Sequence, residues 1–232
     1  MRLLLLSNST APGRKYLEHA LDALAEALTD VRRLLFVPYA LADHDDYTAQ
    51  VDKALSPLGV EVVGAHQGDP VELLDSAQAV FLGGGNTFRL LRALYAQELL
   101  APIRDRVAGG TVYIGSSAGT NMACPTIRTT NDMPIVEPPS FDALGLIPFQ
   151  INPHYLDPVK GDTHMGETRE ERIAQFHEEN DVPVLGMREG TWLSCMDSSV
   201  TLDGAAAGAR LFQRSGVTEV SAGTDLSRLL GS

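Results

Sequence analysis

The sequence predicts a three-layer α/β fold with a mostly parallel central sheet. Short, fully apolar runs recur through the first half of the 232-residue chain, as at residues 3–6 and 34–37. Segments with apolar residues at helical spacing separate these runs. Because the runs are apolar throughout and do not alternate with polar residues, they fit strands that are buried on both faces. That pattern is typical of a parallel sheet between two helical layers.

The elements of the first half follow from the places where the apolar runs end. The first run stops at Ser7-Asn8-Ser9, and the second stops at Pro38, which has no N–H for a sheet ladder. Leucines three and four residues apart predict a helix between these two strands. Strands are expected at 3–6, 34–37, 60–63, 79–82 and 111–114. Helices are expected at 17–28, 45–55 and 71–77, after Thr87, and after the last strand.

The second half changes in character. Residues 126–136 are rich in Thr, Ile and Val but are broken by Asn131-Asp132 and Pro134, which predicts irregular or hairpin structure at the sheet margin. Thr168 and Glu171 form a capping box that predicts a helix to about residue 178. Further strands are expected at 149–151, 184–185 and 191–196, with short β runs from 198 onward. No repeat or linker divides the sequence, so we expect one domain over residues 1–232.

The composition argues against several classes of function. A formal charge of −12 would repel nucleic acid and anionic membranes. The two cysteines, Cys124 and Cys195, lie outside any metal-binding or CxxC spacing and predict a reducing compartment without disulfides. No apolar run approaches the ~18 residues of a membrane span. We therefore expect a cytoplasmic protein without a nucleic-acid or membrane partner.

The strongest chemical signal is GSSAG at residues 115–119, directly after a predicted strand. A G-x-S-x-G pattern in this position puts its serine, here Ser117, at the tip of a sharp strand-to-helix turn with the hydroxyl exposed. The flanking glycines let strand and helix pack closely. The pattern is therefore typical of a serine nucleophile. A turn without chemistry and a phosphate-binding turn remain open.

A second glycine-rich turn, GGGNT at residues 83–87, also follows a predicted strand, and Asn86 or Thr87 suits the cap of the next helix. Free backbone N–H groups at such a place bind anions or stabilise an oxyanion. A dinucleotide site is disfavoured because the G-x-G-x-x-G spacing and the later acidic residue are absent. A tight turn without a ligand remains the alternative.

Among the six histidines, only His154 directly follows a predicted strand, at the sheet end where Ser117 is expected. A histidine that activates a serine needs a carboxylate behind it to orient the ring and stabilise its charged form. Glu189 follows the predicted strand 184–185, and Asp132 lies in the loop after the nucleophile helix. From the residues alone, both carboxylates qualify.

Six ordered motifs between residues 80 and 195 together resemble the peptidase E family of α-aspartyl dipeptidases. They are GGGNTF (83–88), GSSAG (115–119), ACPTIRTTNDMPIV (123–136), QINPH (150–154), GETREER (166–172) and EGTW (189–192). The resemblance implies a flavodoxin-like α/β fold related to class I glutamine amidotransferase domains. It also implies a catalytic triad of Ser117, His154 and Glu189, no metal or other cofactor, and a cytoplasmic homodimer. The implied reaction is hydrolysis of dipeptides with an N-terminal aspartate.

Within this reading, other residues are given roles in binding the substrate. Backbone N–H groups of Gly85 and Ala118 are expected to hold the oxyanion of the reaction. Asp132 is assigned to the α-ammonium group of the dipeptide. Asn86 is expected to contact the substrate as well.

The aspartyl side chain needs a local cation in a protein of charge −12. Arg169 is the first residue after a predicted helix cap, where the helix N–H groups add positive potential. We therefore predict that Arg169 binds the substrate carboxylate, with Arg128 as the alternative. Arg188 adjoins Glu189 and is expected to pair with acidic neighbours instead.

Two other functions remain open on the sequence. A cyanophycinase-like enzyme would use the same triad to hydrolyse β-aspartyl-arginine polymer. A catalytically inactive, metabolite-binding α/β domain would use the same glycine turns, although the complete Ser-His-Glu set argues against it. The sequence decides neither the preference for the residue after aspartate nor whether the loop 155–165 closes over the site.

Overall fold

The computed structural model describes residues 1–158, 161 and 165–231, and it confirms the predicted α/β fold. Within these residues the main sheet has eight strands in the order β12-β9-β8-β1-β5-β4-β2-β3. Strands β1 to β5 are parallel to one another, and β8, β9 and β12 extend the sheet in antiparallel fashion. The strands are Arg2–Leu6 (β1), Arg33–Val37 (β2), Glu61–Gly64 (β3), Ala79–Leu82 (β4), Val112–Ser116 (β5), Thr191–Met196 (β8), Ser199–Gly204 (β9) and Thr224–Asp225 (β12).

Helices cover both faces of this sheet because successive strand residues point to opposite sides. Leu4 and Leu6 of β1 pack with the helices of one face, α1 (Leu21–Ala27) and α2 (His44–Leu55). Leu3 and Leu5 pack in the cluster on the other face. The helices of that second face are α3 (Pro70–Ser76), α4 (Thr87–Ala96), α5 (Leu100–Ala108) and α6 (Ala118–Ala123). Short 3₁₀ helices lie at Glu18–Ala20, Ser56–Leu58, Ala65–Gln67 and Ser227–Leu230.

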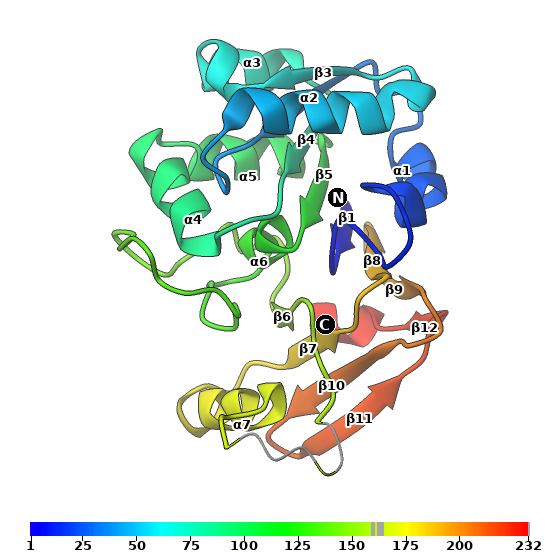
Figure 1. Cartoon of the computed structure of the whole chain (residues 1–232), viewed down its shortest axis with the longest axis vertical. Helices are drawn as coiled ribbons and strands as arrows, with labels where there is room; N and C mark the ends of the chain where they lie inside the picture. The colour runs from blue at the N-terminus through cyan, green and yellow to red at the C-terminus, as the bar shows by residue number, and fades with distance from the viewer. Residues whose placement is uncertain (159–160, 162–164, 232) are drawn as a thin grey trace.

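A second, smaller sheet lies beside the main sheet, and the sequence had not indicated it. Its order is β11-β10-β7-β6, with only β6 and β7 parallel. The helix α7 (Arg169–Glu179) packs on it through Ile173. Figure 1 shows β10, β11 and α7 together at the lower end of the molecule. The four strands are Gln150–Asn152 (β6), Val184–Met187 (β7), Ala209–Gln213 (β10) and Gly216–Val220 (β11).

Two helical expectations differ from the structure. The helix expected over 17–28 begins later, at Leu21, because Leu17 has the left-handed φ of 59°, which ends regular helical geometry. The helix α5 was not predicted from the sequence, since Pro102 interrupts its apolar spacing. The proline lies in the first turn of the helix, where a backbone N–H would have no helical acceptor, so its absence costs no hydrogen bond.

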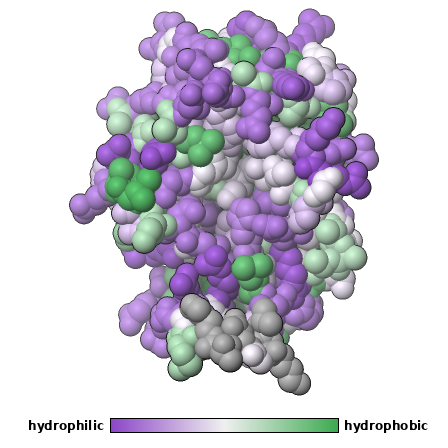
Figure 2. Space-filling view, in the orientation of Figure 1, coloured by the Kyte–Doolittle hydropathy of each residue, from purple (hydrophilic) through white to green (hydrophobic). Residues whose placement is uncertain are grey.

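The face of the molecule in Figure 2 is largely hydrophilic, with apolar residues in small separate groups. Large exposed apolar side chains include Met133, Ile135 and Phe141, all in the segment between α6 and β6. In the described ranges, no helix is both long and apolar enough to cross a membrane.

Candidate active site

Ser117 lies at a strained turn between β5 and α6. Its φ of 52° and ψ of −106° are rarely adopted by a residue with a side chain. Two glycines make the turn possible. A Cβ on Gly119 would overlap the carbonyl oxygen of Leu82, and a Cβ on Gly115 would lie 2.6 Å from the carbonyl oxygen of Gly119. This turn places the serine at the carboxyl edge of the parallel strands, where ligands of α/β sheets bind.

The structure brings Ser117, His154 and Glu189 into one chain of hydrogen-bonding distances. Ser117 Oγ lies 3.0 Å from His154 Nε2, and His154 Nδ1 lies 2.7 Å from Glu189 Oε1. With Nδ1–H donating to the carboxylate, Nε2 is free to accept the serine proton. The side chains of His154 and Glu189 are 39% and 43% exposed, so a substrate can reach them. Glu189, and not Asp132, lies behind the imidazole.

Ser7 and Asn8 connect the two sheets beneath this arrangement. Ser7 Oγ accepts from His154 N at 3.0 Å and donates to the carbonyl oxygen of Met187 at 2.9 Å. Asn8 Oδ1 accepts from Gly190 N at 2.7 Å. The turn after β1 therefore fixes the backbone on which the histidine and the glutamate stand.

Sequence reasoning missed this function of Ser7 and Asn8, which it took only as the end of a strand. A signal was available, because two polar residues directly after a buried strand lie at the same sheet edge as the nucleophile. Both side chains are fully buried, where a polar group needs a partner.

Two predicted oxyanion donors flank the nucleophile. Ala118 contributes the first amide of α6, and Gly85 lies in the turn after β4 with φ 130°. Neither N–H donates to another residue in the part of the chain that the structure describes. A Cβ on Gly84 would lie 3.4 Å from Ser117 Cβ, so the glycine turn after β4 lies close to Ser117. Both amides are thus available to a negatively charged oxygen.

Asp132 and Asn86 bind the start of α4. Asp132 Oδ2 accepts from Thr87 N at 2.7 Å and from Thr87 Oγ1 at 2.6 Å. Asn86 Oδ1 accepts from Arg89 N at 3.0 Å, and its Nδ2 donates to the Met133 carbonyl at 2.8 Å. The side chain of Asn86 is therefore engaged as a helix cap. Asp132 Oδ1 accepts no hydrogen bond from another described residue and remains open to a cation.

The three arginines considered from the sequence differ in their surroundings. Arg188 pairs with Asp157 at 2.6 Å and with Glu219 at 3.1 Å, so its predicted pairing with acidic neighbours is confirmed. Arg128 is exposed and lies over the ring of Phe141, 5.2 Å from its centroid.

Arg169, the first residue of α7, is half-buried and makes no ion pair with another described residue. Its burial lowers the pKa of the guanidinium, and the neighbouring Arg172 lowers it further. The charge of Asp132 opposes both effects, which shows that Asp132 lies nearby.

A second histidine, His19, lies near the site. The ring of His19 lies 6.4 Å from the ring of Trp192, and burial lowers the pKa of His19. The charge of Glu189 partly opposes that shift in pKa, so His19 is a neighbour of the site that sequence reasoning had set aside. His164 and the centre of the loop 155–165 lie outside the described residues.

The fold and the site define an α/β protein with a serine nucleophile turn and a Ser-His-Glu constellation. A model of peptidase family S51 matches residues 3–203, and the chain belongs to that family. The resemblance inferred from the six motifs is therefore confirmed.

Individual relatives agree with this assignment. The protein named peptidase E of Streptomyces coelicolor is 61% identical over 232 residues, covering 99% of this chain and 95% of the relative. A Drosophila melanogaster protein named probable alpha-aspartyl dipeptidase is 53% identical over 221 residues, covering 94% and 92%. The crystal structure of a peptidase from an acI-B1 Actinobacterium shares the fold, with a TM-score of 0.72 at 17% identity over 97% of this chain and 96% of that one.

Proposed function

We propose that the protein is a serine dipeptidase that hydrolyses dipeptides with an N-terminal aspartate. Membership of family S51 and the names of its relatives support this substrate class. One observation carries the chemistry. Ser117 Oγ lies 3.0 Å from a histidine nitrogen whose opposite nitrogen lies 2.7 Å from a carboxylate. That geometry activates a serine for attack on a carbonyl.

In the first half of the proposed reaction, Ser117 Oγ attacks the carbonyl carbon of the aspartyl residue while His154 Nε2 takes the hydroxyl proton. The N–H groups of Ala118 and Gly85 hold the oxygen that becomes negative. Glu189 stabilises the imidazolium. The C–N bond then breaks, and His154 returns the proton to the leaving amine. The products are the free second amino acid and an aspartyl ester of the serine.

In the second half, a water molecule takes the place of the leaving amine. His154 Nε2 removes one proton from the water as its oxygen attacks the ester carbonyl, and the same two N–H groups hold the oxyanion. The ester bond breaks, and the proton passes to Ser117 Oγ. Aspartate leaves and the enzyme is regenerated, so each turnover consumes one water molecule and one peptide bond.

Selectivity for aspartate requires a cation, and Arg169 at the start of α7 is a half-buried guanidinium without an ion-pair partner among the described residues. We assign it to the aspartyl side chain. The second oxygen of Asp132 is assigned to the α-ammonium group, since only Oδ2 of this carboxylate accepts hydrogen bonds from described residues. Arg128 remains the alternative cation, and Asn86 is expected to act through the position of its helix.

The cellular setting is also part of the proposal. Both cysteines are buried and unpaired, which supports a reducing compartment, and we propose that the enzyme works in the cytoplasm. From the family resemblance we propose that it is a homodimer.

The decisive experiment is a turnover screen of wild-type enzyme and Ser117→Ala on Asp-Leu, Asn-Leu, Glu-Leu, β-Asp-Leu and Ala-Leu. We expect wild type to prefer Asp-Leu, and the variant to lose on the order of 10⁶ in turnover with the fold unchanged by circular dichroism. EDTA should leave the rate unchanged, because the proposed steps use only side chains and backbone amides. Retention of a tenth of the activity by Ser117→Ala would exclude the serine mechanism, and preference for β-Asp-Leu would indicate the cyanophycinase-like reaction.

A further inference from the structure

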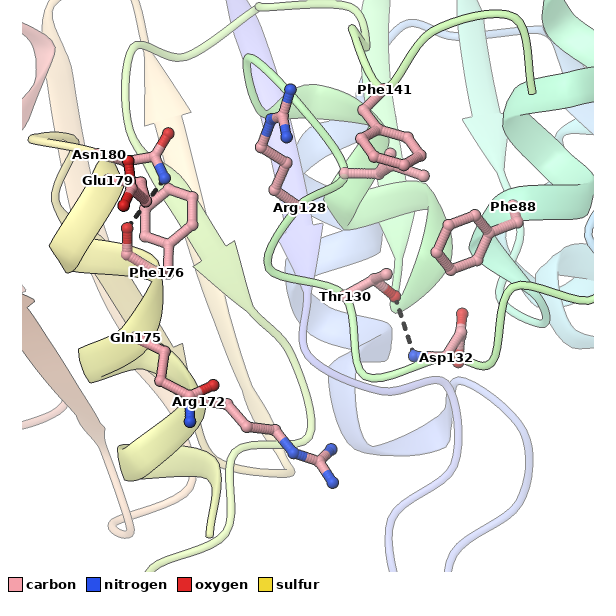
Figure 3. A pocket seen from close by; sticks show the side chains of 11 residues that line it. Phe88, Arg128, Thr130, Asp132, Phe141, Arg172, Gln175, Phe176, Glu179 and Asn180 are labelled. Carbon is pink, nitrogen blue, oxygen red and sulfur yellow. Dashed lines mark hydrogen bonds between the residues drawn. The ribbon is translucent and has the colours of Figure 1, made fainter. Parts of the chain in front are cut away.

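A cavity of about 460 Å³ lies between α7 and the segment that follows α6. Figure 3 shows Phe88 and Phe141 on one side of it and Phe176 of α7 on the other. The rings of Phe88 and Phe141 meet edge to face, with centroids 6.2 Å apart. Arg128 and Arg172 also line it, whereas the three proposed catalytic residues do not. The cavity is thus an aromatic space lined by charges of both signs, with Asp132 and Glu179 beside the two arginines, and it is separate from the three proposed catalytic side chains.

One wall of the cavity is shared with the oxyanion turn. Thr130 and Asp132 both line the cavity. Thr130 Oγ1 lies 3.0 Å from Thr87 Oγ1, and Asp132 Oδ2 lies 2.7 Å from Thr87 N. Thr87 is only two positions after Gly85, whose N–H faces the proposed oxyanion.

The same wall also reaches the proposed general base. Asn131, between the two lining residues, donates from Nδ2 to the carbonyl oxygen of Pro153 at 2.7 Å, directly before His154. The loop 130–132 therefore lines the cavity through Thr130 and Asp132 and contacts the residue before His154 through Asn131.

On the opposite side, α7 lines the cavity with Arg172 and Phe176, and Arg169 lies one turn before Arg172 on the same helix. Arg169, Arg172 and Phe176 are three and four positions apart on α7 and so share a face. A rise of 1.5 Å per residue separates the two arginine backbones by about 4.5 Å along the axis. Two positive charges this close repel each other, and an anion bound to either guanidinium would reduce that repulsion. The ion pair of Arg172 with Glu167, at 3.6 Å between half-exposed groups, is weak and easily exchanged.

We propose that this cavity binds the residue after the aspartate, taking a large apolar or aromatic side chain between the phenylalanines and the terminal carboxylate on Arg172. The proposal rests on the Asp-X dipeptidase function. An Asp-X dipeptide carries two carboxylates and one ammonium group, which the proposal matches to Arg169, Arg172 and Asp132; Arg128 and Glu179 also line the cavity. The assignment also predicts slower cleavage of tripeptides, because in a tripeptide the terminal carboxylate no longer lies opposite Arg172.

The apolar part is tested with Asp-Gly, Asp-Ala, Asp-Leu and Asp-Phe. We expect kcat/KM of wild type to rise about 10-fold from Asp-Ala to Asp-Phe. Phe176→Ala and Phe141→Ala should remove most of that gain and change Asp-Ala by less than about 3-fold. Val71→Ala, an exposed apolar residue of α3, is the matched control. If Phe176→Ala unfolds, Phe141→Ala carries the test alone, because its side chain is 41% exposed. An equal loss on all four peptides would overturn the proposal.

The charged part is tested with Asp-Leu beside its C-terminal amide. Arg172→Gln should lower kcat/KM for Asp-Leu about 30-fold and leave the amide nearly unchanged, because only the free acid pairs with the guanidinium. Arg92→Gln, an exposed arginine of α4 outside the cavity, is the matched control. Equal effects on acid and amide, or no effect, would remove Arg172 from the site. A wild type that cleaves no Asp-X peptide would instead refute the underlying dipeptidase function, so the two failures are distinguishable.

Discussion

Replacing Arg169 with methionine tests the origin of aspartate selectivity. The substitution keeps the length of the aliphatic stem on α7 but removes a half-buried guanidinium that has no ion-pair partner among the described residues. In the free enzyme, burial and Arg172 both disfavour its charge. We therefore expect the variant to fold at least as stably as wild type, which separates a loss of binding from a loss of structure.

The expected magnitude follows from the burial of Arg169. Removing one partner of a buried charge pair costs about 2–5 kcal/mol, and a half-buried group belongs in the lower part of that range. About 2–3 kcal/mol corresponds to a loss of roughly 30- to 150-fold in kcat/KM for Asp-Leu. The neutral amide of Asn-Leu forms a weaker bond worth about 1 kcal/mol, so its loss should be only about 5-fold.

The assay is the ratio of kcat/KM for Asp-Leu to that for Asn-Leu in wild type, Arg169→Met and Arg128→Met. The ratio should fall about 6- to 30-fold in the Arg169 variant. Arg128→Met is the matched comparison, since it removes an equal charge from the exposed rim. If Arg169→Met keeps the wild-type ratio while Arg128→Met loses it, the reasoning is refuted and Arg128 binds the carboxylate.

Three further predictions concern the scaffold of the site. Ser7→Ala removes the acceptor of His154 N; kcat should fall about 10-fold with KM little changed, and an unchanged kcat would deny Ser7 a positioning role. Burial lowers the pKa of His19 below its usual 6.5, so the unfolded chain binds a proton first and stability falls as pH drops below that value. The melting temperature of His19→Phe should therefore fall less than that of wild type between pH 8 and pH 5. Parallel curves of melting temperature against pH would contradict this. Gly119→Ala would force a Cβ into the Leu82 carbonyl; urea titration should show a loss of about 3 kcal/mol or more, and wild-type stability would contradict the close packing.

Much of the main sheet could be predicted because its signals are local. Each of these signals depends only on nearby residues: the fully apolar strands, the capping box at Thr168 and the glycines around Ser117. Strands β1 to β5 accordingly lie within one or two residues of their expected positions. The order of side chains along a strand also separates the two helical faces without any knowledge of topology.

The second sheet could not be predicted because strand partners are not encoded locally. Nothing in the sequence of the three-residue strand β6 indicates that it pairs with β7 and not with β5. The same limit applies to the site. The residues alone left Glu189 and Asp132 equivalent as partners of His154, and only the family resemblance favoured Glu189. The structure separates them, since Asp132 caps a helix through Thr87, at a distance in sequence that no spacing rule covers.

The division of the site between two sheets has a consequence for incomplete chains. Ser117 follows a strand of one sheet, His154 and Glu189 follow strands of the other, and Ser7 and Asn8 join them through hydrogen bonds from the turn after β1. The parts needed for hydrolysis are therefore spread from the beginning of the chain to Glu189. A nascent or cleaved chain that lacks the second sheet would contain Ser117 without its proposed partners His154 and Glu189. A chain that ends before Glu189 accordingly lacks the carboxylate that lies 2.7 Å from His154 Nδ1.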